Sequence, residues 1–157
     1  MYQLKTTFDN VGGVTRCVAI PLSDFGQVKT SRLLESRTLT LRSTGNCIDI
    51  ECNRSEHFSS ALTTSDDGSA YNHSFSGSIF TMDGNRELLL DKLSRQQWLL
   101  FVRTSNGQQY LLGTEDVPLT FSYTDSSGRY GREKAKIDYS FAALESEPAL
   151  IIDNSPL

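Results

Sequence analysis

The stretch QQWLLFVRTSNGQQYLLGTEDVPLTFSYT, residues 96–124, decides the fold class. Its two apolar runs lie on either side of Asn106-Gly107. Both residues of that pair tolerate the positive φ angles that a type I′ turn demands, so they are the strongest hairpin signal in the chain. The run Val117–Thr124 then alternates between apolar and polar residues, which is typical of a strand with one buried face. The stretch therefore predicts a β-hairpin that continues into another strand.

The first arm of this hairpin carries an uninterrupted apolar run, WLLFV at Trp98–Val102. A strand without polar alternation is expected to be buried on both of its faces. Elsewhere, aromatic residues occur singly along the predicted strands, which is the spacing expected of core residues. We expect the core to be anchored by Trp98, Phe101, Phe121, Tyr139 and Phe141.

Alternating or β-branched segments predict further strands in both halves of the chain. They are Val14–Ile20, Thr38–Arg42, Cys47–Cys52, Ser74–Phe80 and Lys136–Ala142. Because a turn containing Gly45 separates the second of these segments from the third, we expect Thr38–Cys52 to form a hairpin.

One segment, Asn85–Gln96, has the pattern of an α-helix. Its residues Leu89, Leu90 and Leu93 share one face at helical spacing. Glu87 lies in the first turn, where the helix dipole favours an acidic side chain. Strands and helix together predict a mainly β protein, an antiparallel β-sandwich or barrel of about seven to nine strands with one flanking α-helix over about residues 85–96.

A polar segment, residues 53–72, interrupts this pattern. A polar stretch of that length inside a small domain is usually an exposed loop with a function, so we expect a long loop here. Its centre is the candidate assembly contact: Ser65, Asp66, Asp67, Gly68 and Ser69. The whole chain, residues 1–157, is the right length for a single domain, with an N-terminal arm at residues 1–13 and a C-terminal arm at residues 145–157.

Composition excludes several classes of protein. With 38% hydrophobic and 22% charged residues, a packed core is expected and disorder of the whole chain is not. The formal net charge of −4 repels phosphate backbones, which argues against sequence-specific binding of nucleic acid. The main basic cluster consists of Arg129, Arg132, Lys134 and Lys136. Acidic residues interrupt it, so we interpret it as a solvated turn and strand face.

The three cysteines, Cys17, Cys47 and Cys52, show no regular disulfide framework. Their small, odd number predicts reduced thiols and synthesis in a cytosol. The first residues, MYQLKTTFDN, have neither the basic region nor the apolar core of a secretion signal, and no apolar run is long enough for a membrane span. We therefore expect no contact with a membrane.

The sequence contains no catalytic set that we can identify. The two histidines, His57 and His73, lie outside any nucleophile frame such as G-x-S-x-G, and we interpret both as surface residues. Asp49 and Glu51 lie two apart on one strand face, which is typical of a solvated face rather than of a carboxylate pair across a cleft. We therefore predict that the protein is not an enzyme.

Metal and cofactor sites are equally unsupported. Cys47, Cys52 and His57 follow a C-x4-C-x4-H spacing, unlike the C-x2-C spacing of structural zinc sites. The two cysteines are an odd number of positions apart, so a single strand would point them to opposite faces. The Asp-Asp-Gly run at residues 66–68 lacks the alternating ligands and the closing glutamate of a calcium loop. We expect no metal and no cofactor.

The C-terminal half has a recognisable order of elements. It combines a leucine-rich helix, a tryptophan-bearing strand, an Asn-Gly hairpin, the run GTEDVPLTFSYTDSSG at residues 113–128 and a last alternating strand that ends near SFAAL at residues 140–144. The run VGGVTRCVAIPLSDF at residues 11–25 accompanies this order. In these features the chain resembles small uncharacterised proteins encoded in the tail and structural modules of phages and prophages of gut Bacteroidetes.

This resemblance implies a structural protein of a phage virion, made in the cytoplasm of the bacterial host. Proteins of the tail-tube type are compact β-barrels or sandwiches with a helix on the flank. They assemble into rings, often hexameric, through sheet edges, a long loop and terminal arms. The resemblance implies copies of the same chain and other virion proteins as partners, and DNA that passes without sequence-specific contact. It implies no catalytic residue.

Two other functions remain open at this point. A β-sandwich binding or decoration module, which recognises a carbohydrate or another virion protein, requires exposed aromatic residues, and Phe58, Tyr71 and Tyr130 are the candidates. A small enzyme requires a pocket with perturbed titrating groups. Ring assembly instead requires sheet edges, loops or arms that find partners in neighbouring copies.

Overall fold

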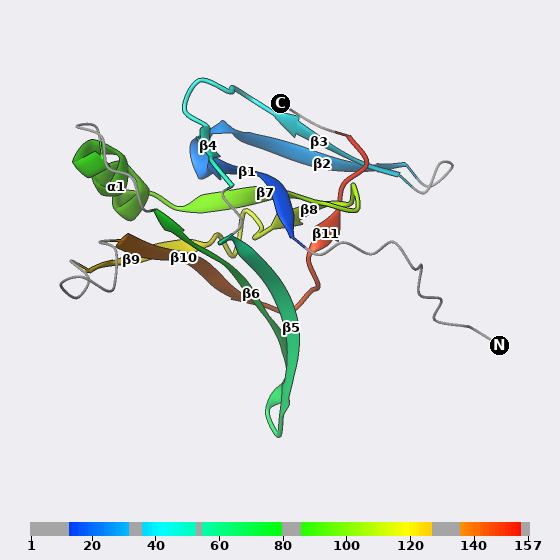
Figure 1. The fold of residues 1–157 in the computed structure, drawn as a ribbon. Helices are drawn as coiled ribbons and strands as arrows, with labels where there is room; N and C mark the ends of the chain where they lie inside the picture. The colour runs from blue at the N-terminus through cyan, green and yellow to red at the C-terminus, as the bar shows by residue number, and fades with distance from the viewer. Residues whose placement is uncertain (1–12, 32–35, 53–54, 80–85, 127–135, 155–157) are drawn as a thin grey trace.

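The computed structural model describes residues 13–31, 36–52, 55–79, 86–126 and 136–154 (Figure 1). Within these ranges the chain forms eleven β-strands, one short 3-10 helix and one α-helix. In chain order, the elements are β1 (Val14–Pro21), η1 (Leu22–Asp24), β2 (Phe25–Ser31), β3 (Ser36–Leu41), β4 (Ile48–Ile50), β5 (His57–Ser65), β6 (Gly68–Ile79), α1 (Arg86–Arg95), β7 (Trp98–Thr104), β8 (Gln109–Leu112), β9 (Thr120–Ser126), β10 (Lys136–Glu145) and β11 (Leu150–Ile151).

The strands form three antiparallel sheets that lie in layers (Figure 1). The middle sheet has five strands in the order β11-β8-β7-β1-β4, and the four-stranded sheet has the order β5-β6-β10-β9. The β2–β3 ribbon covers the other face of the middle sheet. This arrangement confirms the predicted mainly β sandwich with a flanking helix, and no sheet in the described part of the chain closes into a barrel.

Strand β7 shows why the middle sheet is buried on both faces. Trp98, Leu100 and Val102 belong to the larger core cluster, which lies between the middle sheet and the four-stranded sheet. Leu99 and Phe101 point the other way, toward the β2–β3 ribbon, and belong to the second core cluster. All five side chains are fully buried. The expectation that the run WLLFV is buried on both faces is confirmed.

The Asn-Gly hairpin joins β7 to β8 as predicted. The backbone N–H of Thr104 donates to the carbonyl of Gln108 at 2.9 Å, so the loop between these paired residues is Ser105–Gly107. Gly107 has a φ of 83°, in the left-handed region that glycine tolerates best. The loop thus has one residue more than a type I′ turn, and three-residue loops with a left-handed glycine are the next most common hairpin connection.

The third run of the stretch at residues 96–124 changes sheet. Leu119 bridges to Trp98 through two backbone hydrogen bonds, from Leu119 N to Trp98 O at 2.8 Å and from Trp98 N to Leu119 O at 3.2 Å. The chain then continues as β9, which pairs with β10 in the four-stranded sheet. The strand covers Thr120–Ser126 rather than the predicted Val117–Thr124, because the chain crosses between layers at this bridge.

Four phenylalanines form one row across the four-stranded sheet. Phe58 on β5 pairs with Phe75 on β6, which pairs with Phe141 on β10. Phe141 pairs in turn with Phe121 on β9, and these two ring centroids are 4.9 Å apart. Such cross-strand aromatic pairs stabilise a sheet and fix its register. All five aromatic residues expected to anchor the core are buried, including Tyr139, which lies beside the row.

The predicted hairpin over Thr38–Cys52 is wrong. Strand β3 pairs with β2 in the ribbon, whereas β4 pairs with β1 at the edge of the middle sheet. The buried residue Asp24 holds the connection between them. Its Oδ2 accepts the N–H of Asn46 at 3.2 Å, and its carbonyl accepts the N–H of Arg42 at 2.8 Å. These contacts lie where the chain passes from the β2–β3 ribbon to the middle sheet. The alternation of apolar and polar residues in the strands does not predict them.

The predicted C-terminal arm is, over its described part, built into the fold. After β10 the chain returns as β11, which pairs with β8 at the edge of the middle sheet. Ile152 is buried in the second core cluster. The side chain of Asn154 accepts the N–H of Leu39 at 2.8 Å and donates to the carbonyl of Leu39 at 3.0 Å. Residues 145–154 are therefore not a free arm, and residues 155–157 lie outside the described part of the chain.

Helix α1 covers Arg86–Arg95, within one residue of the predicted segment at each end. Leu90 and Leu93 are buried, whereas Leu89 is 38% exposed, so the buried face is narrower than the predicted face of three leucines. The indole Nε1 of Trp98 donates to the carbonyl of Leu93 at 2.8 Å. This hydrogen bond fixes the end of the helix against β7.

Candidate functional site

The loop expected at residues 53–72 is wrong, because all of its described residues except 55 and 56 belong to a β-hairpin. Strands β5 and β6 pair without interruption from His57 opposite Ser76 to Ser65 opposite Gly68. Serines and threonines occupy both faces of β5 and separate Phe58 from Leu62 on the core-facing side, which hides the alternation that usually marks a strand. Of the described residues of the expected loop, only 55, 56 and the two-residue turn at the tip lie outside the strands.

The five residues expected to make the assembly contact lie at the tip of this hairpin. They are Ser65, Asp66, Asp67, Gly68 and Ser69, and all are exposed. Gly68 has a φ of 132°, which favours glycine at that position. The hydroxyl of Ser65 donates to the carbonyl of Gly68 at 3.2 Å. The fold therefore gathers these residues into one tight turn.

The distal half of the hairpin extends beyond the rest of the four-stranded sheet. The pairing between β6 and β10 ends where Tyr71 lies opposite Glu145. Residues 63–70 then pair with no described strand other than the opposite arm of the hairpin. Figure 1 shows the hairpin projecting away from the three layers. Every residue from 61 to 69 is exposed, so this half of the hairpin adds almost nothing to the core of its own chain.

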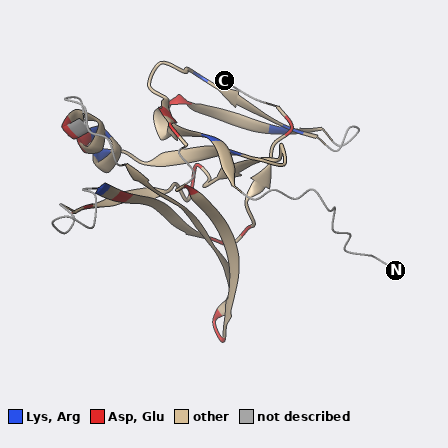
Figure 2. Cartoon of the chain, in the orientation of Figure 1, with Lys and Arg blue, Asp and Glu red and all other residues tan. Residues whose placement is uncertain are grey.

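Strand β5 is also an open edge, because among the described strands it pairs only with β6. Its nine residues, HFSSALTTS, include no Lys, Arg, Asp, Glu or Pro. Soluble proteins usually protect an exposed edge with such residues, because unpaired backbone N–H and C=O groups are a template for another strand. Figure 2 shows acidic residues at the tip of the hairpin and no charged residue along β5. An unprotected edge of this length is expected to have a partner.

On the core-facing side of β5, solvent exposure of the side chains increases toward the tip of the hairpin. Phe58 packs against Tyr110 of β8, with ring centroids 4.9 Å apart. Leu62, on the same side of the strand toward the tip, is 55% exposed. The open edge thus carries an apolar side chain that is more than half in contact with solvent.

A buried contact between a histidine and a glutamate lies at the base of the hairpin. His73 on β6 is fully buried, and its Nε2 lies 3.0 Å from Oε2 of Glu145 and 3.0 Å from the carbonyl oxygen of Glu147. The imidazole stacks with Tyr71, with ring centroids 6.3 Å apart. Its Nδ1 is buried and has no hydrogen-bond partner among the residues described. The pair ties β6 to the turn after β10, at the point where the hairpin leaves the sheet.

The prediction that both histidines are surface residues is therefore right for one and wrong for the other. His57 is exposed, as predicted for a surface residue. The same prediction for His73 is wrong, because β6 begins at Gly68 rather than at Ser74. The longer strand places His73 on the core-facing side, two residues before the buried Phe75.

The thiols and carboxylates of the described residues form no cluster that could hold a metal ion. Cys47 packs against the second core cluster and Cys52 against the larger one, so they lie on opposite faces as expected. Burial raises the pKa of Cys17 well above its ordinary value and that of Cys52 to about 11. Both thiols are protonated at neutral pH, which makes them weak ligands and nucleophiles. Asp49 and Glu51 are exposed, as expected of a solvated strand face.

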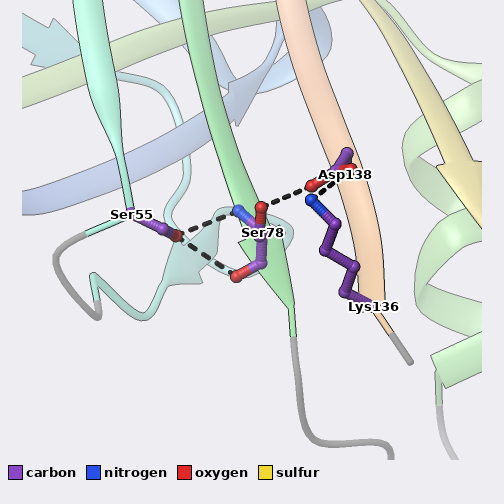
Figure 3. Close-up of polar contacts among 4 residues, drawn as sticks. All are labelled: Ser55, Ser78, Lys136 and Asp138. Atoms are coloured by element: carbon purple, nitrogen blue, oxygen red, sulfur yellow. Dashed lines mark hydrogen bonds and ion pairs between the residues drawn. The ribbon is translucent and has the colours of Figure 1, made fainter. Parts of the chain in front are cut away.

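The arrangement closest to a catalytic set lies on the outer face of the four-stranded sheet (Figure 3). Ser78 Oγ donates to Asp138 Oδ1 at 2.5 Å, and Lys136 Nζ lies 2.9 Å from Asp138 Oδ2. These contacts with Ser78 and Lys136 lower the pKa of Asp138. A carboxylate with a lowered pKa is a weaker base, so it is poorly suited to activate the serine. With the hydrogen bonds between Ser55 and the backbone of Ser78, the group instead ties neighbouring strands together.

The aromatic candidates for a carbohydrate site are engaged in the fold where they are described. Phe58 packs against Tyr110, and Tyr71 is half-buried and stacks with His73. Neither offers a free ring to a sugar, so these two residues do not favour a carbohydrate-binding module.

Several predictions fall on residues outside the described part of the chain. They concern the N-terminal arm up to residue 12, residues 53 and 54 of the expected loop, the basic residues Arg129, Arg132 and Lys134, and the aromatic residue Tyr130. These stay predictions.

Comparison of this chain with protein-family models, curated proteins and solved structures finds no match. Within the described ranges, no helix has both the length and the hydropathy needed to cross a membrane. A proposal for the function therefore rests mainly on the open edge of β5 and on the hairpin that carries it.

Proposed function

We propose that this protein is a structural subunit of a phage virion, a tail-tube or tail-connector protein that assembles with copies of itself into rings. The observation that carries this proposal is the open edge of β5, nine residues without Lys, Arg, Asp, Glu or Pro on a projecting hairpin. On this proposal the subunit acts by assembling and not by catalysing a reaction, because its edge and hairpin fit surfaces on neighbouring copies.

The edge offers two kinds of stabilisation to a partner. A strand added along β5 satisfies backbone groups that otherwise bond to water, and each such hydrogen bond contributes about 0.5–1.5 kcal/mol net. A partner that covers Leu62, now 55% exposed, adds on the order of 1 kcal/mol from apolar burial. The two strands of the hairpin are already paired, and His73 contacts Glu145 at its base, so little of the hairpin has to be ordered on association.

The position of the hairpin favours a head-to-tail contact between copies. When the hairpin of one copy contacts the body of the next, the second copy still has its own hairpin free for a third. Such a head-to-tail contact generates a closed ring if the rotation between copies completes a circle, and an open filament if it does not. The projecting hairpin is therefore a suitable element for a repeated, one-directional contact.

The assignment to a phage tail is supported by the order of elements, which resembles that of small proteins encoded in phage tail and structural modules, and by the outer face of the four-stranded sheet. That face consists mainly of small residues, among them Ser74, Ser76, Ser122, Thr124 and Ser140. With a net charge of −4 on the chain, such a face offers few cations to retain DNA that passes along it. The partners on this proposal are copies of the chain and other virion proteins, and the location is the virion.

The assembly is tested by measuring the mass of the full chain by light scattering over a wide range of concentrations, with electron microscopy of the same samples. We expect a multimer of defined mass and ring-shaped particles. A monomer at every concentration would contradict assembly, and open filaments would contradict ring closure. The virion role is tested by mass spectrometry of purified particles of a phage that encodes the chain, where its absence would refute that role.

A further inference from the structure

The open β5 edge has a matching strand in the sequence of the chain itself. Residues 2–9, YQLKTTFD, alternate, so that Tyr2, Leu4 and Phe8 fall on one face and charged and polar residues fall on the other. We infer that residues 2–9 of one copy pair as an additional strand with the β5 edge of a neighbouring copy, an inference that rests on the assembly proposed above. It specifies which segment of the neighbour occupies the edge.

The point from which this segment departs is fixed by Gly13. The carbonyl of Gly13 accepts the N–H of Ser105 at 3.0 Å, beside the loop between β7 and β8. Gly13 has a φ of 121°, which residues with a side chain rarely adopt. The residues before it span up to about 40 Å when extended, at roughly 3.3 Å per residue. That reach is sufficient to lie along a strand of another copy.

The spacing of apolar residues selects one register. On β5, Phe58 and Leu62 occupy alternate positions of the core-facing side and are separated by three residues. Leu4 and Phe8 have the same separation. Antiparallel pairing of Leu4 with Leu62 places Phe8 opposite Phe58, and all apolar side chains of the segment then lie on the core-facing side of the sheet.

This register is consistent with the surroundings of the edge in three respects. Phe8 adds a fifth member to the row of phenylalanines that crosses the four-stranded sheet. Leu4 covers Leu62, the apolar side chain that is more than half exposed in the single copy. Asp9 lies opposite His57, so a carboxylate faces a ring that carries a hydrogen-bond donor.

The register is tested by cross-linking two differently tagged copies of the full chain. Both copies carry Cys47→Ser and Cys52→Ser, which leaves the buried Cys17 as the remaining native thiol. One copy carries Leu4→Cys and the other Leu62→Cys. Diamide then accepts two electrons and two protons as the two thiols form a disulfide. We expect the main product to be a dimer that contains both tags.

The matched control replaces Leu4→Cys with Lys5→Cys, whose side chain falls on the opposite face of the segment. We expect this pair to link with Leu62→Cys at least about tenfold more slowly, because alternate residues of a strand point to opposite sides. Equal rates for the two pairs would overturn the inference. So would a disulfide that forms only within one chain carrying both Leu4→Cys and Leu62→Cys.

A second test needs no cross-linker. Leu4→Lys together with Phe8→Lys places two charges on the core-facing side, and we expect the dissociation constant of the assembly to rise at least about tenfold. Gln3→Lys together with Thr7→Lys adds the same charge on the other face, and we expect the dissociation constant to stay within about threefold. If neither pair weakens the assembly, the inference fails while the proposed function stands. If the unsubstituted chain never assembles, the proposed function fails and the inference fails with it.

Discussion

Strands β7 and β5 belong to the same chain but have opposite surroundings. Strand β7 has a neighbour on each edge and a core cluster on each face, and Trp98–Val102 is fully buried. Strand β5 has a neighbour on one edge only, and residues 60–65 are all exposed. A strand exposed in this way contributes little to the stability of the isolated chain. Its length and its lack of protecting residues are the basis of the assembly role proposed above.

The largest effect is expected in β7. Trp98→Ala removes the indole from the larger core cluster and deletes its hydrogen bond to Leu93, so we expect the free energy of unfolding to fall by about 3–5 kcal/mol. Leu62→Ala in β5 is expected to lower it by less than about 1 kcal/mol, because that side chain is largely exposed. Urea denaturation of the monomeric chain measures both values. Equal losses would contradict the comparison between the two strands.

The next effect concerns the base of the hairpin. His73→Ala leaves the buried carboxylate of Glu145 without its partner, and we expect a loss of about 3 kcal/mol. The double variant with His73→Leu and Glu145→Leu should lose less, because two apolar side chains need no partner. Denaturation of the three chains measures the difference. A His73→Ala chain as stable as the unsubstituted one would show that the contact between His73 and Glu145 does not hold the hairpin.

A moderate effect is expected at Gly77 on β6. An added Cβ would lie 2.6 Å from Oη of Tyr139 and 3.2 Å from Cγ of Glu56, so Gly77→Ala should cost about 1–3 kcal/mol. Tyr139→Phe in the same chain should recover part of this loss, because it removes the nearest atom. Ser76→Ala, on the outer face next to Gly77, serves as the control and should change stability by less than about 0.5 kcal/mol. Thermal unfolding that ranks Gly77→Ala with the control would refute the close approach.

The smallest effect is expected at Asp138, and it depends on pH. Hydrogen bonding from Ser78 and contact with Lys136 lower the pKa of Asp138 in the folded chain. The charged carboxylate therefore stabilises the fold above the ordinary pKa of aspartate, about 3.9, and this contribution is lost as pH falls through the lowered value. We expect the unsubstituted chain to lose slightly more stability than Asp138→Asn on acidification from about pH 5 to pH 2. Identical pH profiles would argue that the contact has no energetic role.

Strand β7, the hairpin that follows it and helix α1 could be predicted from the sequence. The run Trp98–Val102 is apolar without interruption because both faces of β7 are buried, and the glycine after Asn106 marks its hairpin. Helix α1 follows from leucines at helical spacing. The hairpin expected over Thr38–Cys52 failed because Asp24, far away in the sequence, holds the intervening turn. Contacts of that kind leave no local pattern.

The candidate site was predicted less well, for a related reason. Alternation arises where one face of a strand is buried, and the distal hairpin buries neither face in its own chain. A weaker signal was present in the sequence. Phe58 and Phe75, like Leu62 and Tyr71, are placed symmetrically about the turn at residues 66–67, as hairpin partners must be. This symmetry predicts the hairpin even though residues 61–69 are all exposed.

The role of the β5 edge in assembly is tested most directly with two exposed leucines. Leu62 lies on the edge strand β5 and is 55% exposed, whereas Leu144 lies on the central strand β10 and is 63% exposed. Each is replaced by lysine in the full chain, and mass is measured by light scattering across a concentration series, with denaturation confirming that both variants are folded. We expect Leu62→Lys to remain monomeric at concentrations where the unsubstituted chain and Leu144→Lys form the multimer. A Leu62→Lys chain that assembles as well as Leu144→Lys would contradict the assignment of the β5 edge as the assembly surface.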